Sequence, residues 1–170
     1  MSEKLKMSEK QKEQEFNYVR ISPGFENTLL ELNNTVFTDN CRITNKNSNY
    51  LAKLCKNKSG YIALKDKHAV GYIICDQYKY PNIKEPVQTI MALGVLEPYR
   101  GAGIGTELIK RALSIYEEPL YEPLYLCVRT SSLARKLYDK LQFKQYAICS
   151  KIYKDPVEDG IIMMHVNTTK

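Results

Sequence analysis

The sequence has no apolar run that approaches the roughly 18 residues of a membrane-spanning helix. Residues 1–17 also lack the apolar core of a secretory signal, so we expect a protein of the cytoplasm, or of the nucleus. The five cysteines are widely scattered and include no Cys-x-x-Cys pair. This spacing argues against a disulfide framework and against a zinc site, and we predict no bound metal.

Acidic residues are outnumbered by basic ones, 19 against 25, which gives a formal net charge of +6. Many of the basic residues lie between positions 110 and 154. A basic surface attracts the phosphates of a coenzyme or of ribosomal RNA, but an ordinary solvated face has the same composition. No recognised RNA- or DNA-binding motif accompanies the charge, so nucleic-acid binding is only a secondary hypothesis.

The length of 170 residues, 44% of them hydrophobic, predicts one domain that buries a core of its own. Residues 1–15 repeat Met-Ser-Glu-Lys and alternate in charge, so we assign them to a flexible tail that precedes a domain at 16–168. Strands are predicted at 16–21, 60–64, 69–78, 88–96, 124–128, 144–152 and 161–166. Helices are predicted at 25–37, 50–57, 104–116 and 132–141. This order of elements indicates a single α/β domain with a partly parallel sheet.

A glycine-rich stretch joins the predicted strand at 88–96 to the predicted helix at 104–116. It reads Arg-Gly-Ala-Gly-Ile-Gly-Thr over residues 100–106. The glycines allow a tight turn with exposed N–H groups, and the positive end of a helix dipole follows, so the stretch is suited to bind phosphate. It lacks both the Lys-Ser/Thr of a Walker A loop and the Gly-x-Gly-x-x-Gly spacing of a dinucleotide fold. The alternative is a glycine-rich turn without a ligand.

The pattern Arg100-x-x-Gly103-x-Gly105 is similar to the acetyl-coenzyme A (acetyl-CoA) signature of the GNAT N-acetyltransferases. Residues 90–100 resemble a strand and lead-in of the protein N-terminal acetyltransferases, most closely the NatE catalytic subunit, which acts on N-termini that begin with Met. Further segments resemble parts of the same enzymes at 69–75, 133–143 and 153–160. The resemblance extends over 18–166 and implies a GNAT fold, with a mixed seven-stranded sheet, four helices and a cleft where the fourth and fifth strands splay apart.

The resemblance implies acetyl-CoA as the cosubstrate. The loop at 100–106 would take the pyrophosphate, the backbone of 93–95 would pair with the pantetheine arm, and the Val95 N–H would stabilise the oxyanion. Ser131 lies near the position of an Asn that binds pantetheine in many relatives. The coenzyme-binding residues implied in this way are Leu93, Gly94, Val95, Arg100, Gly101, Ala102, Gly103, Ile104, Gly105, Thr106 and Ser131.

Catalytic residues follow less completely from the resemblance. Tyr138 falls where the GNAT tyrosine approaches the coenzyme sulfur and would donate to the leaving thiolate, unless it only packs inward. The tyrosine and histidine that relay the amine proton in NatE are replaced here by Thr89 and Cys127. Thr89 can bind water but cannot act as a base, and Cys127 is either a candidate base or a small core residue. An α-amine, whose pKa is about 7.7 to 8, is partly neutral at cellular pH without a base.

Three residues match those that enclose the first residues of the substrate in NatE, namely Phe37, Met91 and Tyr153. The chain after Phe37 departs from that family, because Asp39 brings a negative charge close to this site. The identity of the substrate is therefore open. Asp39 and Tyr153 are also reserve candidates for the general base, whereas both histidines are interpreted as structural.

We therefore expect acetyl transfer from acetyl-CoA to the α-amino group of protein N-termini, Met-starting ones among them, with a side activity on lysine. One alternative is a GNAT enzyme that acetylates a small amine or an internal lysine. The other is a weakly active, coenzyme-binding scaffold subunit of a ribosome-associated acetyltransferase complex. The expected partners are nascent or free N-termini, with an auxiliary subunit and the ribosome as further candidates.

Overall fold

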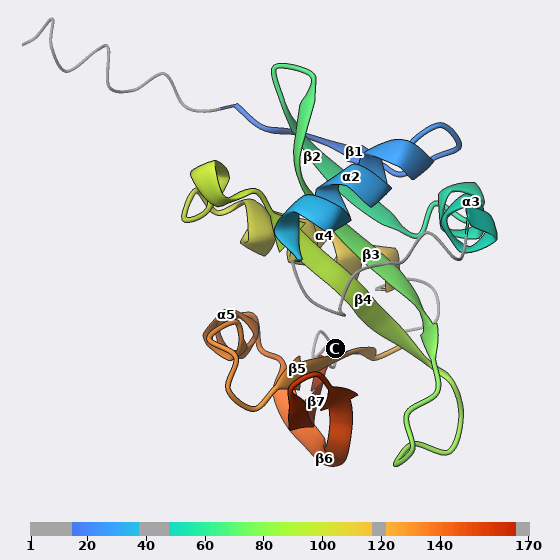
Figure 1. Ribbon diagram of the computed structural model, residues 1–170, viewed down its shortest axis with the longest axis vertical. Helices are drawn as coiled ribbons and strands as arrows, with labels where there is room; N and C mark the ends of the chain where they lie inside the picture. Colours follow the sequence, from blue (N-terminus) through green and yellow to red (C-terminus); the bar gives the residue numbers. More distant parts are fainter. Residues whose placement is uncertain (1–14, 38–47, 117–121, 166–170) are drawn as a thin grey trace, which may run out of the picture.

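The computed structural model describes residues 15–37, 48–116 and 122–165, which form a seven-stranded sheet and four helices (Figure 1). The strands are β1 (Asn17–Arg20), β2 (Gly60–Lys65), β3 (His68–Tyr78), β4 (Val87–Val95), β5 (Leu124–Arg129), β6 (Lys144–Lys154) and β7 (Val157–His165). The helices are α2 (Glu26–Val36), α3 (Ser48–Lys56), α4 (Ile104–Tyr116) and α5 (Arg135–Lys140), with a 3-10 turn η2 (Glu97–Tyr99). None of these helices is long and apolar enough to cross a membrane. The predicted fold class, mixed sheet and four helices are confirmed.

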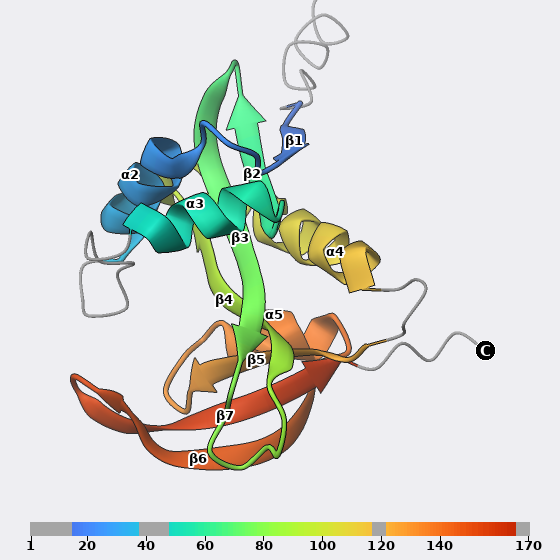
Figure 2. The same cartoon turned by 90° about the vertical axis from the view of Figure 1, so that its right-hand side faces the viewer.

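The sheet has the order β1-β2-β3-β4-β5-β7-β6, and it opens in the middle, between the parallel strands β4 and β5. These strands pair only at Thr89–Tyr125 and Ile90–Leu126 and then diverge, as Figures 1 and 2 show. The register between β3 and β4 shifts at this point, which makes Met91 the extra residue of a β-bulge. A bulge bends its strand and increases the local twist, so it turns the end of β4 away from β5. The predicted splay of the fourth and fifth strands is confirmed.

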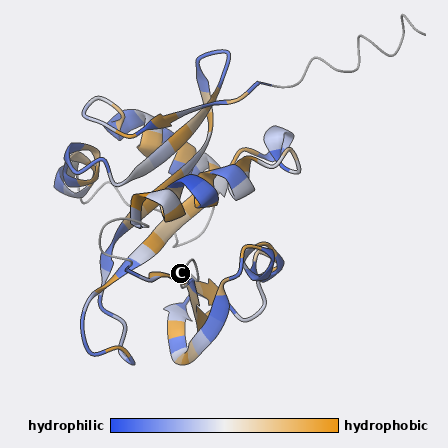
Figure 3. Ribbon diagram, turned by 180° about the vertical axis from the view of Figure 1, so that it is seen from behind, coloured by the Kyte–Doolittle hydropathy of each residue, from blue (hydrophilic) through white to orange (hydrophobic). Residues whose placement is uncertain are grey.

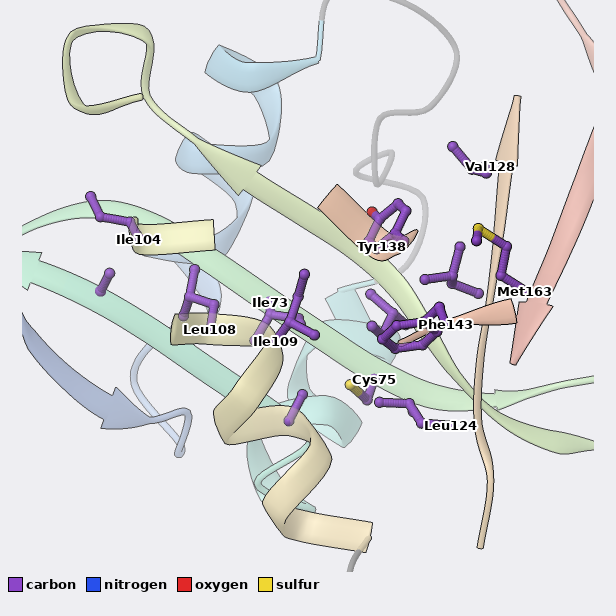
Figure 4. Close-up of a cluster of buried hydrophobic side chains, with 14 of the residues drawn as sticks. Ile73, Cys75, Ile104, Leu108, Ile109, Leu124, Val128, Tyr138, Phe143 and Met163 are labelled. Carbon is purple, nitrogen blue, oxygen red and sulfur yellow. The ribbon is translucent and has the colours of Figure 1, made fainter. Parts of the chain in front are cut away.

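Strand β3 is buried on both faces, and its side chains alternate between two apolar cores. Tyr72 and Ile74 pack with residues of α2 and α3. Ile73 and Cys75 face the opposite side and join a cluster that includes Leu108 of α4 (Figure 4). In Figure 3 the apolar residues concentrate on the strands, while the helices carry hydrophilic residues as well. The helices on both faces thus hold the N-terminal half of the sheet rigid beside the opening.

Two elements begin three or more residues away from their predicted positions. Helix α5 begins at Arg135 rather than at 132, because the Ser132 hydroxyl accepts the Ala134 N–H (3.2 Å) and holds a turn before the helix. Strand β7 begins at Val157 rather than at 161, because its hairpin with β6 is paired as far as Lys154 and Val157. The second difference lengthens the hairpin that borders the opening between β4 and β5.

Candidate active site

The glycine-rich loop lies between η2 and α4 and borders a cavity of about 350 Å³. Gly101 and Gly103 have φ of +79° and +82°, a conformation that favours glycine, and a Cβ built on either would meet no atom within 4 Å. The first hydrogen bond of α4 runs from the Glu107 N–H to the Gly103 carbonyl (3.0 Å), so the N–H groups of residues 104–106 have no partner within the helix. These N–H groups and the helix dipole provide an anion site over open space.

The Arg100 side chain connects this loop to the end of β4. Its Nε donates to the Val95 carbonyl at 3.0 Å. The N–H and the carbonyl of one strand residue point to the same edge, so Val95 directs both groups away from β3 and toward the opening. Leu93 shares that edge because alternate residues of a strand do, whereas Gly94 faces β3. The edge of β4 therefore offers backbone N–H groups to a ligand in the cleft.

A central cavity of about 320 Å³ fills the space where β4 and β5 diverge. β4 contributes Met91 and Leu93 to its walls, β5 contributes Cys127 and Arg129, and α5 contributes Tyr138. Phe37, at the end of α2, and Tyr153, on the β6–β7 hairpin, also line it. Segments far apart in the sequence thus converge on one cleft.

A third cavity, of about 240 Å³, continues the cleft toward the β3–β4 connection. Ile90, Met91, Cys127 and Tyr153 line both this cavity and the central one. Its other lining residues are Tyr78, Tyr80, Thr89 and Ile152. Among the described residues of its lining none is acidic or basic, so the cavity offers hydroxyl groups, a thiol and apolar surface. We call it the amine pocket, after the substrate amine that the sequence predicts beside Met91, Cys127 and Tyr153.

The sequence matches the model of the acetyltransferase (GNAT) family over residues 27–143, which contain the glycine-rich loop, β5 and Tyr138. The chain belongs to the GNAT family. This confirms the family that the sequence motifs predict.

Relatives of this GNAT protein carry names that fit the predicted reaction. The N-alpha-acetyltransferase of Saccharolobus solfataricus is 33% identical over 111 residues, which are 61% of this chain and 66% of the relative. That of Sulfurisphaera tokodaii is 35% identical over the same coverage. The chain thus spans about two thirds of the length of these curated relatives. Arabidopsis thaliana Naa50, solved with the bisubstrate analogue CoA-Ac-MVNAL, superposes with a TM-score of 0.72 at 25% identity, over 88% of this chain and 97% of that one.

Tyr138, which the sequence predicts to be the GNAT tyrosine, lies on α5 at the border between the cleft and the apolar core. It is 8% exposed, and its ring packs edge-on against Phe143 with the centroids 5.9 Å apart (Figure 4). Burial raises the pKa of the Tyr138 hydroxyl to about 12. The hydroxyl is therefore protonated at neutral pH, as a donor to a thiolate must be.

Thr89 and Cys127 both reach the amine pocket, but neither is built as a base. Burial raises the pKa of the Cys127 thiol, which therefore stays neutral at pH 7. The Thr89 hydroxyl is committed to the Val87 carbonyl, to which it donates at 3.0 Å. A titrating base thus has to come from another group or from water.

Tyr153 is held in the cleft by a polar cluster at the turn of the β6–β7 hairpin. The Arg129 guanidinium lies 4.3 Å from the centre of the Tyr153 ring and donates to the carbonyls of Asp155 (2.8 Å) and Pro156 (3.0 Å). The same guanidinium pairs with Glu158 at 3.3 Å. We call this group the Arg129 cluster. It fixes both the hairpin and the ring that the hairpin places beside the cleft.

Glu158 anchors the Arg129 cluster to the β5–α5 connection. Its Oε1 accepts the Ser131 N–H (2.6 Å) and the Thr130 hydroxyl (2.7 Å). These hydrogen bonds, the one from the Ser131 backbone first, lower the pKa of Glu158 from 4.5 to about 2. Ser131 is thus turned to Glu158, and the neighbouring Ser132 lines the central cavity in its place.

The structure brings most of the predicted site residues together along one cleft. The loop cavity is lined by Val95, Arg100, Gly101, Gly103, Ile104, Gly105 and Thr106, and the other two by Phe37, Thr89, Met91, Leu93, Cys127, Tyr138 and Tyr153. Ala102 and Ser131 line none of the three cavities, and Gly94 is buried against Tyr72. Asp39 lies outside the described residues. His68 is exposed beyond the cleft, and His165 stacks against Phe143 with the ring centroids 5.2 Å apart.

Sequence reasoning missed several residues of the cleft wall, namely Tyr78, Tyr80, Arg129, Ser132 and Ile152. Ser131 was predicted where the structure has Ser132, because the turn before α5 was predicted as helix. Tyr80 lies in a connection with two prolines, which predicts an exposed loop and not a buried side chain. The aromatic ring of Tyr80 was the one feature of that segment that could have indicated a buried side chain.

Proposed function

We propose that the protein transfers the acetyl group of acetyl-CoA to the α-amino group of protein N-termini. The observation that supports this most is the continuity of the site, which leads from an anion-binding loop, along an open strand edge, to an uncharged pocket. The pyrophosphate would lie on the N–H groups of the loop at 100–106. The pantetheine arm would bond to the cleft edge of β4 at Leu93 and Val95. No metal takes part in this proposal.

The reaction needs only groups that this chain supplies. The neutral amine attacks the thioester carbonyl, the C–N bond forms, and the C–S bond breaks as the tetrahedral intermediate collapses. The Val95 N–H would stabilise the oxyanion, and the Tyr138 hydroxyl would donate to the departing thiolate. The amine proton would leave through water in the amine pocket, because Cys127 is neutral and Thr89 cannot titrate. An α-amine suits this site because its pKa is about 7.7 to 8, against about 10.4 for lysine, which would be a slower side substrate.

The amine pocket and its surroundings favour an N-terminus that begins with an apolar side chain such as Met. Phe37, Met91 and Tyr153 supply aromatic and thioether surface beside the amine. The analogue solved with Naa50 contains the peptide MVNAL. A free lysine or a polyamine would bring a second charge to a pocket that lacks a described carboxylate.

We also propose the setting in which the enzyme works. The catalytic domain would comprise residues 16–168 and act in the cytoplasm on nascent or free chains. Lys136, Lys140 and Lys144 are exposed around α5 and suit a ribosomal or auxiliary-subunit contact. A coenzyme-binding scaffold is the second candidate, favoured by the absence of a titrating base at Thr89 and Cys127.

Two measurements test the function. Wild-type protein is assayed with acetyl-CoA on peptides with different first residues, beside an internal lysine peptide and a polyamine. Turnover is expected on peptide α-amines, with slower turnover on the lysine peptide, whereas turnover on the polyamine alone would overturn the proposal. Coenzyme binding without turnover would favour the scaffold.

The second measurement locates the coenzyme by a matched pair of glycine variants. Gly103→Ala is expected to weaken acetyl-CoA binding by more than tenfold, because its Cβ fills the space above the loop. Gly24→Ala is the control, because Gly24 also has a positive φ (+105°) and open space around it but lies far from the loop in sequence and site. Both variants should lose about 1 kcal/mol of unfolding free energy. Equal coenzyme affinity in the two would place the binding site elsewhere.

A further inference from the structure

Strand β6 is irregular where it passes the amine pocket. Its register with β7 shifts between Cys149 and Tyr153, so β6 carries extra residues there. Lys151, within this bulge, has a φ of +50°, and its N–H donates to the Asp159 carboxylate at 2.7 Å. Consecutive residues of a regular strand point to opposite faces. The bulge instead lets Ile152 and Tyr153 both line the amine pocket.

Gly160 of β7 is buried and covered by three side chains of the pocket wall. A Cβ built on it would lie 2.5 Å from the Cys127 Sγ, 2.6 Å from the Ile152 Cγ2 and 3.3 Å from the Tyr153 Cε2. Carbon atoms in contact are normally about 3.5 to 4.0 Å apart, so the first two side chains could not keep their places beside a methyl group. The φ of Gly160 lies outside the left-handed region, so the obstacle is contact and not backbone strain. The wall of the amine pocket therefore depends on the missing side chain of residue 160.

We propose that Gly160 determines which N-termini the enzyme accepts, because it keeps the amine pocket large enough for a long apolar first side chain such as that of Met. This inference rests on the proposed function. A methyl group at residue 160 would push the Cys127 thiol and the Ile152 side chain toward the open space that they border, which is the amine pocket. The pocket of about 240 Å³ would shrink and still admit a small first residue. Gly160 itself does not line the pocket, so it is a positioning residue that acts through the side chains packed on it.

The test compares two peptides that differ only in the first residue, Met in one and Ala in the other. Gly160→Ala is expected to lower kcat/KM for the Met peptide by about 10- to 200-fold, the range for one methylene in a hydrophobic pocket, and to change the Ala peptide much less. The affinity for acetyl-CoA should not change, because Gly160 lines none of the three cavities. Ile162→Val is the control, because Ile162 is buried in the adjoining apolar cluster without lining the pocket. This control should lose stability and keep the Met-to-Ala ratio of the wild type.

A second set of variants separates pocket size from a loss of folding. Cys127→Ala removes the atom closest to the added methyl group. Gly160→Ala should therefore cost the Met peptide less in the Cys127→Ala background than in the wild type, by about fivefold or more. If Gly160→Ala does not fold, Ile152→Ala tests the same wall in the opposite direction. It should raise kcat/KM for a peptide that begins with Phe relative to the Met peptide.

An unchanged Met-to-Ala ratio in Gly160→Ala, with the variant folded by circular dichroism, would overturn the inference. An unchanged Phe-to-Met ratio in folded Ile152→Ala, or a wild-type preference for the Ala peptide, would overturn it as well. If the wild-type enzyme acetylates lysine or a polyamine instead, the proposed function fails, and the same variants compared on a long and a short amine still decide the role of Gly160. Acetylation of no amine would overturn both.

Discussion

Burial sets the protonation state of the two groups at the centre of the cleft. Tyr138 has its pKa raised to about 12, and the pKa of Cys127 is raised as well, in both cases because the charged form loses hydration. A neutral phenol is useful to a leaving thiolate because it can donate. A neutral thiol is of no use to an amine because it cannot take its proton. The same physical effect thus prepares one residue for the reaction and excludes the other.

Tyr138→Phe should lower kcat by about 10- to 1000-fold and change KM for the peptide much less. The donated hydrogen bond forms as the thiolate develops, so it stabilises the transition state more than the ground state. Steady-state kinetics on the best peptide measures the change. The variant should fold normally, because the ring contact with Phe143 is retained. An unchanged kcat would restrict Tyr138 to a packing role.

Cys127→Ala should leave the pH profile of kcat/KM almost unchanged. The limb near pH 8, which reports ionisation of the peptide amine, should remain. Burial raises the pKa of the thiol above its ordinary value, so the thiol is protonated near pH 8 and its removal takes away no base there. The measurement is kcat/KM from pH 6 to 9 for both proteins, with coenzyme binding as the control. Loss of the limb in the variant would identify Cys127 as the base.

The residues that sequence could predict are those whose role depends on local chain geometry. The loop at 100–106 needs positive φ at two glycines and a helix start, and both leave a signal in the order of residues. Tyr80 and Ser132 could not be predicted in this way. Tyr80 reaches the amine pocket only because a distant part of the sheet buries it, and Ser132 faces the cleft only because Glu158 holds its neighbour.

At the scale of elements, the β6–β7 hairpin is positioned mainly by its interactions with β5. Turn and strand propensities predicted both strands, but the start of β7 depends on pairing with β6 and was placed too late. The Arg129 cluster then fixes the hairpin relative to β5 through two backbone carbonyls, a ring and a carboxylate. Such contacts join residues about 25 positions apart, beyond the reach of local patterns.

Glu158→Gln should reduce the acid sensitivity of the fold. The carboxylate has a pKa of about 2 in the folded protein and an ordinary value of 4.5, so it stabilises the folded state above pH 4.5, and this contribution is lost as the pH falls toward 2. The variant lacks that contribution at every pH. Urea midpoints at pH 6 and pH 3 should therefore differ less in the variant than in the wild type. Equal differences would show that Glu158 is not linked to folding.

At the scale of the whole molecule, the sheet consists of two halves joined by two residue pairs, by the apolar cluster of Figure 4, to which both halves contribute, and by the β3–β4 connection. A coenzyme in the cleft would contact both halves, α4 and the end of β4 on one side and α5 on the other. Ligand binding should therefore stabilise the structure as a unit. The fold class and the splay of the fourth and fifth strands were predicted from the family resemblance, but the link through the β3–β4 connection was not, because the predicted loop had no assigned contacts.

Acetyl-CoA at a hundredfold excess over its Kd should raise the free energy of unfolding by about 2.7 kcal/mol. For a chain of this size the corresponding rise in Tm is roughly 5 to 11 °C. Hydrogen exchange should slow at the amides of Leu93 and Val95, which face the cleft, and change little at Gly94, which faces β3. Gly103→Ala should show neither effect at the same coenzyme concentration. Protection of Gly94 alone would contradict the proposed direction of the β4 edge.

The opening between β4 and β5 also bears on self-association. An unpaired strand edge at the rim of a sheet is a template for a strand from another molecule. The unpaired part of β4 instead lies in the interior of the sheet, opposite β5, and not at a rim where a strand of another molecule could pair with it. At the rims, β1 is only four residues long and β6 carries Lys144, Lys151 and Lys154, both of which discourage edge-to-edge pairing. This fold can therefore keep backbone groups available for a small ligand without exposing them to aggregation.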